Sequence, residues 1–297
     1  MRIKNVLICG LGALGLTYAN KLKDICTLKI LADDERINKF KKNPPILNGS
    51  EIYLEYILPT EDWNPDLIII STKSTGLDSA LSYIKNFVSE NTIIISLING
   101  ISSEEIIKKT YPKAQVLRSY FIGHSAIGVN IDETMQYFQD GVGKIVLEPC
   151  SILEDFFSKN NIDYEISKDI IYSQWLKLGV NIILNEPSAI YKCTVGELRK
   201  RKDYIPLALG LLEEVKQIAQ KNGLNNLDNY VEEVLESANL ISDDGKTSMY
   251  QDVLAKKKTE VDIFSGEIIK LGKIYGIKTP INEDIYNKIK NIERSFS

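Results

Sequence analysis

Residues 6–15 read VLICGLGALG, a short apolar run that leads directly into the glycine spacing G-x-G-x-x-G. The run predicts a buried β-strand, and a helical pattern begins at about Ala13. In this context the first glycine permits a tight turn, the second lets the backbone approach a pyrophosphate, and the third lets helix and strand pack closely. A glycine-rich turn without a ligand is the plain alternative. The cofactor-binding residues predicted here are Gly10, Leu11, Gly12, Ala13, Leu14 and Gly15.

Further apolar runs alternate with helical patterns in the first half of the chain. The strongest lie at residues 28–31, 67–71 and 92–96. Short buried strands separated by helices predict a parallel, doubly wound sheet of the Rossmann type. Weaker candidate strands, which we expect to extend the same sheet, lie at residues 115–119, 126–130 and 144–147.

After about residue 167 the pattern changes to long helical segments. They cover residues 175–185, 206–222, 229–238 and 246–275. The expected fold class is therefore α/β, with an N-terminal Rossmann-type doubly wound parallel sheet followed by an all-helical C-terminal domain. We assign residues 1–167 to a dinucleotide-binding domain and residues 168–297 to a helical substrate and catalytic domain.

Composition excludes several classes of protein. The 297 residues include 36 basic and 40 acidic side chains, a net charge of -4 that argues against nucleic-acid partners and a basic membrane surface. No run approaches the roughly 18 apolar residues of a membrane span, and no signal peptide precedes the first strand, so a cytoplasmic location is expected. The four cysteines form no C-x-x-C pair and His124 is the one histidine, so no metal site is expected.

The choice of cofactor depends on the end of the second predicted strand. Asp33 stands there, and an acidic side chain at this place often accepts hydrogen bonds from the adenosine ribose, which favours NAD(H). Arg36 follows three residues later, where it is able to engage the 2′-phosphate of NADP(H). Asp33 and the two acidic residues after it also suit the cap of the next helix. The sequence therefore leaves both cofactors open.

Two polar residues follow other predicted strands. Lys73 comes after the strand ending at Ser71, and Asn99 with Gly100 comes after the next strand. Ligands of open α/β sheets gather at the carboxyl ends of the strands, so Lys73 and Asn99 are predicted to contact the cofactor. A solvated loop lysine and a tight Asn-Gly turn are the alternatives.

A polar stripe runs along an otherwise apolar helical segment in the second half. Lys177, Asn181 and Asn185 recur every four residues, which places them on one helix face. When a nicotinamide delivers hydride to a carbonyl carbon, the oxygen gains negative charge and needs a proton, and a lysine ammonium supplies both needs. Lys177 is thus the candidate proton donor, with the amides orienting substrate. A snorkelling lysine beside two surface asparagines is the alternative.

A second group of polar residues lies in segment 246–275. Ser248 and Asp252 are one turn apart, and if the helix continues, Glu260 lies two turns beyond Asp252. All three side chains then face one site. The alternative is a helix that Ser248 caps, with two acids facing solvent.

The chain also resembles a known family over nearly its whole length. The shared motifs are Gly10-x-Gly12-x-x-Gly15, Lys73, Asn99-Gly100, Lys177-Leu178-x-x-Asn181-x-x-x-Asn185, Gly196-Glu197-Leu198, Ser248-Met249-x-x-Asp252 and Thr259-Glu260. Together they resemble the ketopantoate reductases, also called 2-dehydropantoate 2-reductases. The resemblance implies NADPH-dependent reduction of 2-dehydropantoate to pantoate, a step toward pantothenate and coenzyme A.

The resemblance also implies roles for individual residues. Lys177 matches the family's proton donor, and Glu260 matches a glutamate close to cofactor and substrate. Substrate would be contacted by Asn99, Asn181, Asn185 and Ser248, with Asp252 organising its neighbours. The expected partner is a small 2-oxo acid, and a homodimer is left open.

Two positions depart from the family pattern. Asp33 stands where members often carry arginine for the 2′-phosphate, and Val195 stands where many carry a substrate-contacting asparagine. An NAD(P)-dependent dehydrogenase of another small 2-oxo or hydroxy acid, and a dinucleotide-binding sensor without catalysis, are the competing interpretations.

Overall fold

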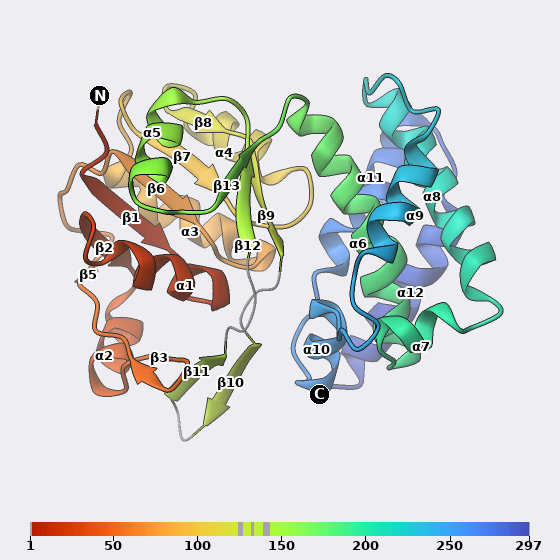
Figure 1. The fold of residues 1–297 in the computed structure, drawn as a ribbon, viewed down its shortest axis with the longest axis horizontal. Coiled ribbons are helices and arrows are strands. Elements are labelled where there is room, and N and C mark those ends of the chain that lie inside the picture. The colour runs from red at the N-terminus through yellow and green to blue at the C-terminus, as the bar shows by residue number, and fades with distance from the viewer. Residues whose placement is uncertain (1, 124–126, 132–133, 139–142, 297) are drawn as a thin grey trace. The chain divides into compact units, whose positions relative to one another are not determined.

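The computed structural model describes residues 2–123, 127–131, 134–138 and 143–296 (Figure 1). It contains two compact units, Met1–Ile170 and Ile171–Ser297. The assignment of cofactor binding to the first domain and substrate binding to the second stays a prediction. His124 lies outside the described residues.

A six-stranded parallel sheet forms the centre of the first unit. Its strand order is β5-β2-β1-β6-β7-β8. The strands are β1 (Asn5–Cys9), β2 (Thr27–Leu31), β5 (Tyr56–Ile57), β6 (Leu67–Ile70), β7 (Ile93–Ser96) and β8 (Gln115–Leu117). Every residue of β6 and β7 is buried, which explains why these strands read as apolar runs, with Ser96 at the end of β7 as the exception, rather than as alternating patterns. This order is that of a doubly wound Rossmann-type sheet, so the predicted fold class is confirmed.

Helices follow most of the parallel strands. They are α1 (Ala13–Leu22), α2 (Asp34–Lys42), α3 (Leu77–Ile84) and α4 (Ser103–Thr110), with short 3-10 turns η1 (Ser74–Gly76) and η2 (Lys85–Phe87). A further helix, α5 (Ser151–Lys159), comes later in the first unit. The strand order reverses direction between β1 and β6, because the chain proceeds from β1 outward to β2 and β5 and then returns to the other side of β1. The carboxyl ends of β1 and β6 therefore define the topological switch point, where such sheets bind ligands.

The expectation that all the later strands extend this sheet is wrong. β9 (Ser119–Gly123), β12 (Gly143–Leu147) and β13 (Tyr164–Ile166) form a separate sheet. A third sheet has the order β10-β11-β3-β4, formed by β10 (Ile127–Ile131), β11 (Thr134–Phe138), β3 (Ile46–Leu47) and β4 (Ser50–Glu51). The main sheet ends where the Arg118 N–H donates to the Glu148 carboxylate at 2.8 Å instead of to a neighbouring strand. The chain then leaves the main sheet, and β9 pairs antiparallel with β12.

The second unit is helical throughout its described residues. Its elements are α6 (Ile170–Tyr191, which begins at the last residue of the first unit), α7 (Val195–Arg199), α8 (Tyr204–Lys221), α9 (Tyr230–Asn239), α10 (Ser248–Leu254), η3 (Val261–Ile263), α11 (Ser265–Tyr275) and α12 (Pro280–Arg294). The side chain of Tyr230 on α9 is fully buried and donates a hydrogen bond to the Trp175 carbonyl at 2.8 Å. Gly179 permits this approach, since a Cβ there would lie 2.8 Å from the Tyr230 hydroxyl. Within the described residues, no helix is both long enough and apolar enough to span a bilayer.

A buried carboxyl group joins three helices of this unit. Glu186 on α6 is fully buried, and its two oxygens lie 2.9 Å from Ser265 N and 2.5 Å from Ser265 Oγ at the start of α11. The same hydroxyl lies 2.9 Å from Asn282 Oδ1 on α12. Ser265 has one hydroxyl proton, and it contacts two possible acceptors, Glu186 and Asn282. Both contacts are hydrogen bonds if Glu186 is protonated and donates to Ser265 Oγ while Ser265 donates to Asn282 Oδ1. Burial raises the pKa of Glu186 to about 8, in agreement with this arrangement.

This carboxyl group makes stability depend on pH. The folded state keeps a proton on Glu186 that the unfolded chain releases near its ordinary pKa of 4.5. The free energy of unfolding should therefore fall as pH rises from 4.5 to about 8, by up to about 1.4 kcal/mol per unit. Glu186→Gln keeps a donor and an acceptor, so urea denaturation should show this slope removed while stability at pH 5 is kept. Equal slopes in both proteins would contradict the assignment.

Candidate active site

Packing around the turn between β1 and α1 requires glycine at two of the three glycine positions of the motif. Gly10 has a φ of +105°, and a Cβ there would lie 2.6 Å from Thr72 N. At Gly15 a Cβ would lie 1.9 Å from the Gly10 carbonyl oxygen. At Gly12, by contrast, no described atom lies within 4 Å of an added Cβ. Close packing therefore explains the first and third glycines, and the open space at the second fits the approach of a pyrophosphate.

The charge at this helix end also suits an anion. Gly12 is the N-cap of α1 and has no side chain to bond the first turn, and residues 13–16 read ALGL without an acid. The positive end of the helix dipole and its N–H groups are thus left for a ligand. The residues present fit the diphosphate of a dinucleotide.

The loop after β6 lies against this turn. Ser71 Oγ donates to the Gly10 carbonyl at 2.7 Å, and Ser71 N–H donates to the Cys9 carbonyl at 2.9 Å. Thr72 Oγ1 is buried and, within the described part of the chain, has no hydrogen-bond partner. An orphan hydroxyl at the switch point is a candidate cofactor contact that sequence reasoning missed. Its one sequence signal was its place between a predicted strand and Lys73.

The other two predicted contacts of this unit follow neighbouring strands. Lys73 is exposed and comes just before the η1 turn. Asn99 is half-buried beyond the end of β7, and Gly100 after it has a φ of +93°. Because β1, β6 and β7 are adjacent and parallel in the sheet, the loops holding the glycines, Lys73 and Asn99 share its carboxyl edge.

Asp33 is engaged in capping. One carboxylate oxygen accepts from Arg36 N–H at 2.9 Å, which caps α2, and the other lies 3.6 Å from Arg36 Nε and accepts from the Tyr83 hydroxyl at 3.4 Å. The Arg36 guanidinium therefore pairs with Asp33. Asp34 and Glu35 add two further acids in the same first turn.

In the second unit, the polar stripe of α6 is partly buried rather than a solvated surface. Lys177 and Asn181 are half-buried, and Asn185 is 8% exposed. Asn185 Nδ2 donates to Asn181 Oδ1 at 3.1 Å. Asn181 Nδ2 is then left buried, with no acceptor among the residues that the structure describes. An unsatisfied buried amide donor costs free energy, which a substrate oxygen would recover.

The start of α10 is tied to the same helix. Thr247, not Ser248, is the N-cap, since Thr247 Oγ1 accepts from Tyr250 N–H at 3.3 Å. Thr247 Oγ1 also lies 2.6 Å from the buried Ser188 Oγ, one turn beyond Asn185 on α6. Ser248 is exposed in the first turn, and Asp252 is half-buried one turn later.

The prediction of one continuous helix through segment 246–275 is wrong. α10 ends at Leu254, and Lys256 adopts a left-handed φ of +50° while Lys257 N–H donates to the Asp252 carbonyl at 2.8 Å. This hydrogen bond is a helix-terminating motif. Glu260 is half-buried at the N-cap of η3, so it does not follow Asp252 on the same helix.

The Gly-Glu-Leu motif shapes the loop that leads to α10. Thr194 and Glu197 form a capping box on α7, and a Cβ at Gly196 would lie 2.6 Å from the Asp243 Cβ. Val195 is fully buried and its N–H donates to the Gly245 carbonyl at 3.0 Å. In this chain the position is part of the core.

A Rossmann-type sheet with a glycine cradle (the turn containing Gly10, Gly12 and Gly15), followed by a helical unit with a lysine–asparagine stripe, defines a nicotinamide-dependent oxidoreductase of the two-domain class. The chain belongs to the ketopantoate reductase family: the ketopantoate reductase PanE/ApbA model matches residues 6–151, and the family's C-terminal model matches residues 169–293. It is therefore an enzyme of the oxidoreductase class.

Individual relatives agree with this membership. The chain is 25% identical over 290 residues to 2-dehydropantoate 2-reductase of Streptococcus pyogenes serotype M6, with 93% of each chain covered. It is 28% identical over 309 residues to the protein of that name from Aquifex aeolicus, covering 97% of this chain and 96% of the relative. A D-mandelate dehydrogenase bound to NADH and anilino(oxo)acetate shares the fold, with a TM-score of 0.85, 24% identity and coverage of 98% and 99%.

Proposed function

We propose that the protein reduces the keto group of 2-dehydropantoate to the hydroxyl of pantoate with hydride from NADH. The proposal for the substrate rests on the amide donor of Asn181, which is buried without an acceptor among the described residues and lies one turn from Lys177 on α6. 2-Dehydropantoate offers carboxylate, keto and hydroxyl oxygens as acceptors for such donors. Family membership supports the same reaction.

Each of these side chains has a role in the proposed reaction. A bound reduced nicotinamide would supply hydride to the carbonyl carbon, and the developing alkoxide would need stabilisation and a proton. Lys177 provides both as an ammonium, and Asn181 and Asn185 orient the substrate oxygens. Ser248 and Asp252 complete the substrate contacts, with Glu260 close to cofactor and substrate.

The cofactor residues we propose lie at the carboxyl edge of the first unit's sheet. Residues 10–15 at the N-terminus of α1 would hold the pyrophosphate, since no described atom lies within 4 Å of a Cβ at Gly12. Thr72 and Lys73 would contact the cofactor from the neighbouring loop, and Asn99 would contact it from the loop after β7.

The end of β2 favours NADH over NADPH. A 2′-phosphate carries close to two negative charges, and it would meet Asp33, Asp34 and Glu35 in one turn of helix. The cation of this turn, Arg36, is already paired with Asp33. Ribose hydroxyls are donors, and the Asp33 carboxylate retains lone pairs to accept from them.

Initial rates test substrate and cofactor together. We expect kcat/KM with 2-dehydropantoate to be higher with NADH than with NADPH. The matched substrate is 3,3-dimethyl-2-oxobutanoate, which lacks the 4-hydroxyl group alone. Its kcat/KM should be lower by a factor of about ten or more, because one lost hydrogen bond to a buried group costs about 1.4 kcal/mol.

Each outcome has a distinct meaning. Faster oxidation of NADPH would contradict the cofactor proposal and leave the substrate proposal intact. Equal rates with the two 2-oxo acids would contradict the substrate proposal. They would favour a dehydrogenase of another 2-oxo acid, an interpretation that the buried Val195 already supports because it removes one polar contact.

A further inference from the structure

We propose that Glu293 and Lys290 of α12 are positioning residues that hold Glu260 in place by clamping the residues on either side of it. This inference rests on the proposed function for the catalytic importance of Glu260. It assigns a role to a helix that the motifs of the sequence do not include.

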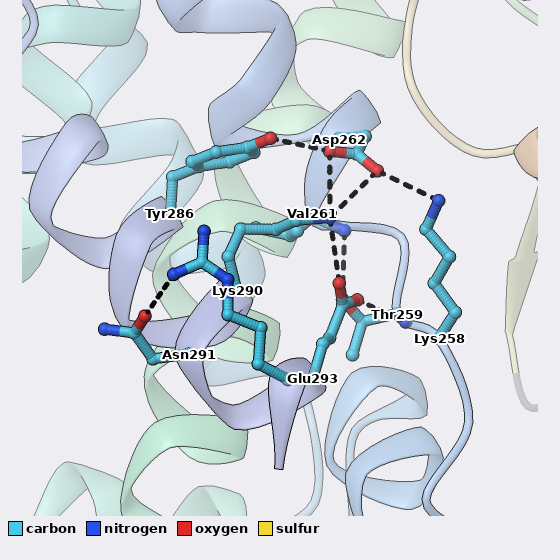
Figure 2. Close-up of polar contacts among 9 residues, drawn as sticks. Lys258, Thr259, Val261, Asp262, Tyr286, Lys290, Asn291 and Glu293 are labelled. Atoms are coloured by element: carbon cyan, nitrogen blue, oxygen red, sulfur yellow. Dashed lines mark hydrogen bonds and ion pairs between the residues drawn. The ribbon is translucent and has the colours of Figure 1, made fainter. Parts of the chain in front are cut away.

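The residue before Glu260 is held by one carboxylate oxygen. Glu293 Oε1 accepts from both Thr259 N–H and Thr259 Oγ1, each at 2.7 Å (Figure 2). Thr259 is 1% exposed, so its N–H and hydroxyl donors are shielded from water. These two hydrogen bonds to one acceptor fix both the backbone and the side-chain rotamer of Thr259.

The residues after Glu260 are held from the same helix face. Asp262 accepts from the Tyr286 hydroxyl at 2.9 Å, and Lys290 Nζ lies 3.4 Å from its carboxylate. Lys290 also pairs with the second oxygen of Glu293 at 2.8 Å. Residues 286, 290 and 293 of α12 follow the i, i+4, i+7 spacing of a single helix face. Figure 2 shows these side chains converging on the segment from Lys258 to Asp262.

The position of Glu260 therefore depends on α12. Residues 255–260 separate the end of α10 from the start of η3 and belong to neither element. Burial by itself raises the pKa of the Glu293 carboxyl, but the Lys290 ion pair and the Thr259 hydrogen bonds outweigh burial and lower the pKa below its ordinary value. The clamp is thus charged, and charge-assisted hydrogen bonds are the stronger kind.

Limited proteolysis tests the clamp without using activity. Trypsin cleaves after lysine, and the bond between Lys258 and Thr259 contains the very N–H that Glu293 holds. Glu293→Ala and Thr259→Val should both be cut at this bond at least about tenfold faster, as mass spectrometry of the fragments would show. Thr259→Ser keeps the hydroxyl and should behave like the unaltered protein. Asp284→Ala, which breaks an exposed ion pair on the same helix, is the matched control and should also be unchanged.

Kinetics then test whether the clamp acts through Glu260. Glu293→Ala should lower kcat about 10- to 100-fold with little change in the KM for cofactor, since a misplacement of about 1 Å in a catalytic site costs up to about this much. The double variant Glu293→Ala/Glu260→Gln should have the same kcat as Glu260→Gln alone, because both changes remove the same contribution to catalysis. Additive effects, or unchanged cleavage at Lys258 in Glu293→Ala, would overturn the proposal. If Glu260→Gln alone left the rate unchanged while cleavage still rose, the proposed role of Glu260 would fail and the clamp would stand.

Discussion

Replacing Lys177 by methionine is expected to lower kcat for 2-dehydropantoate by about two to four orders of magnitude. Methionine keeps an apolar side chain of similar length and removes the ammonium group, so the developing alkoxide loses its counter-charge and its proton. Affinity for the cofactor should change little, because the predicted cofactor contacts lie in the first unit. Steady-state rates and a fluorescence titration of the bound dinucleotide measure the two effects separately.

A second substitution at the same position separates charge from proton donation. Arginine keeps a positive charge but holds its proton with a pKa above about 12, so it stabilises an alkoxide without readily donating to it. Lys177→Arg should therefore be faster than Lys177→Met and slower than the unaltered enzyme. If Lys177→Met turned over at the normal rate, Lys177 would not be the proton donor.

The glycine cradle gives the other large effect, and it offers a matched pair of substitutions. Gly15→Ala should destabilise the protein by about 3 kcal/mol or more, because the new Cβ would lie 1.9 Å from the Gly10 carbonyl oxygen and neither backbone is able to move independently of its strand or helix. Gly12→Ala should fold with nearly normal stability, since no described atom lies within 4 Å of the added methyl group. Urea denaturation compares the two variants.

Cofactor binding should rank these variants differently. The methyl group of Gly12→Ala occupies the space that we assign to the pyrophosphate, so the Kd for NADH should rise at least about tenfold, or about 1.4 kcal/mol. Normal NADH affinity in folded Gly12→Ala would show that the pyrophosphate does not approach this residue. Normal stability of Gly15→Ala would contradict the close packing of α1 on the turn.

The features that sequence reasoning predicted well are local ones. Buried strands such as β6 and β7 are apolar at every position except Ser96, and Gly15 is required by a contact with Gly10, five residues earlier in the chain. The spacing of Lys177, Asn181 and Asn185 likewise predicts a shared helix face from helical geometry alone.

The errors share a different origin. Segment 246–275 reads as one helical pattern, but the left-handed Lys256 ends α10, and a hydrogen bond to Glu293 more than 30 residues away holds Thr259. Similarly, whether Gln115–Leu117 and Ser119–Gly123 share a sheet depends on Glu148, which binds the backbone of the residue between them. The sequence does not single out Thr72, because the burial of its hydroxyl without a described hydrogen-bond partner is a property of the folded chain.

The sequence by itself determined the class of fold and the family and predicted the site of the dinucleotide, because periodicity, glycine spacing and motif spacing are properties of neighbouring residues. The tertiary structure alone decided that Asp33 pairs with Arg36, that Val195 belongs to the core, that Asn181 keeps an unsatisfied donor, and that α12 holds the residues around Glu260. These features depend on burial and on contacts between segments distant in the chain. Such contacts carry no periodic signal, so only the folded chain reveals them.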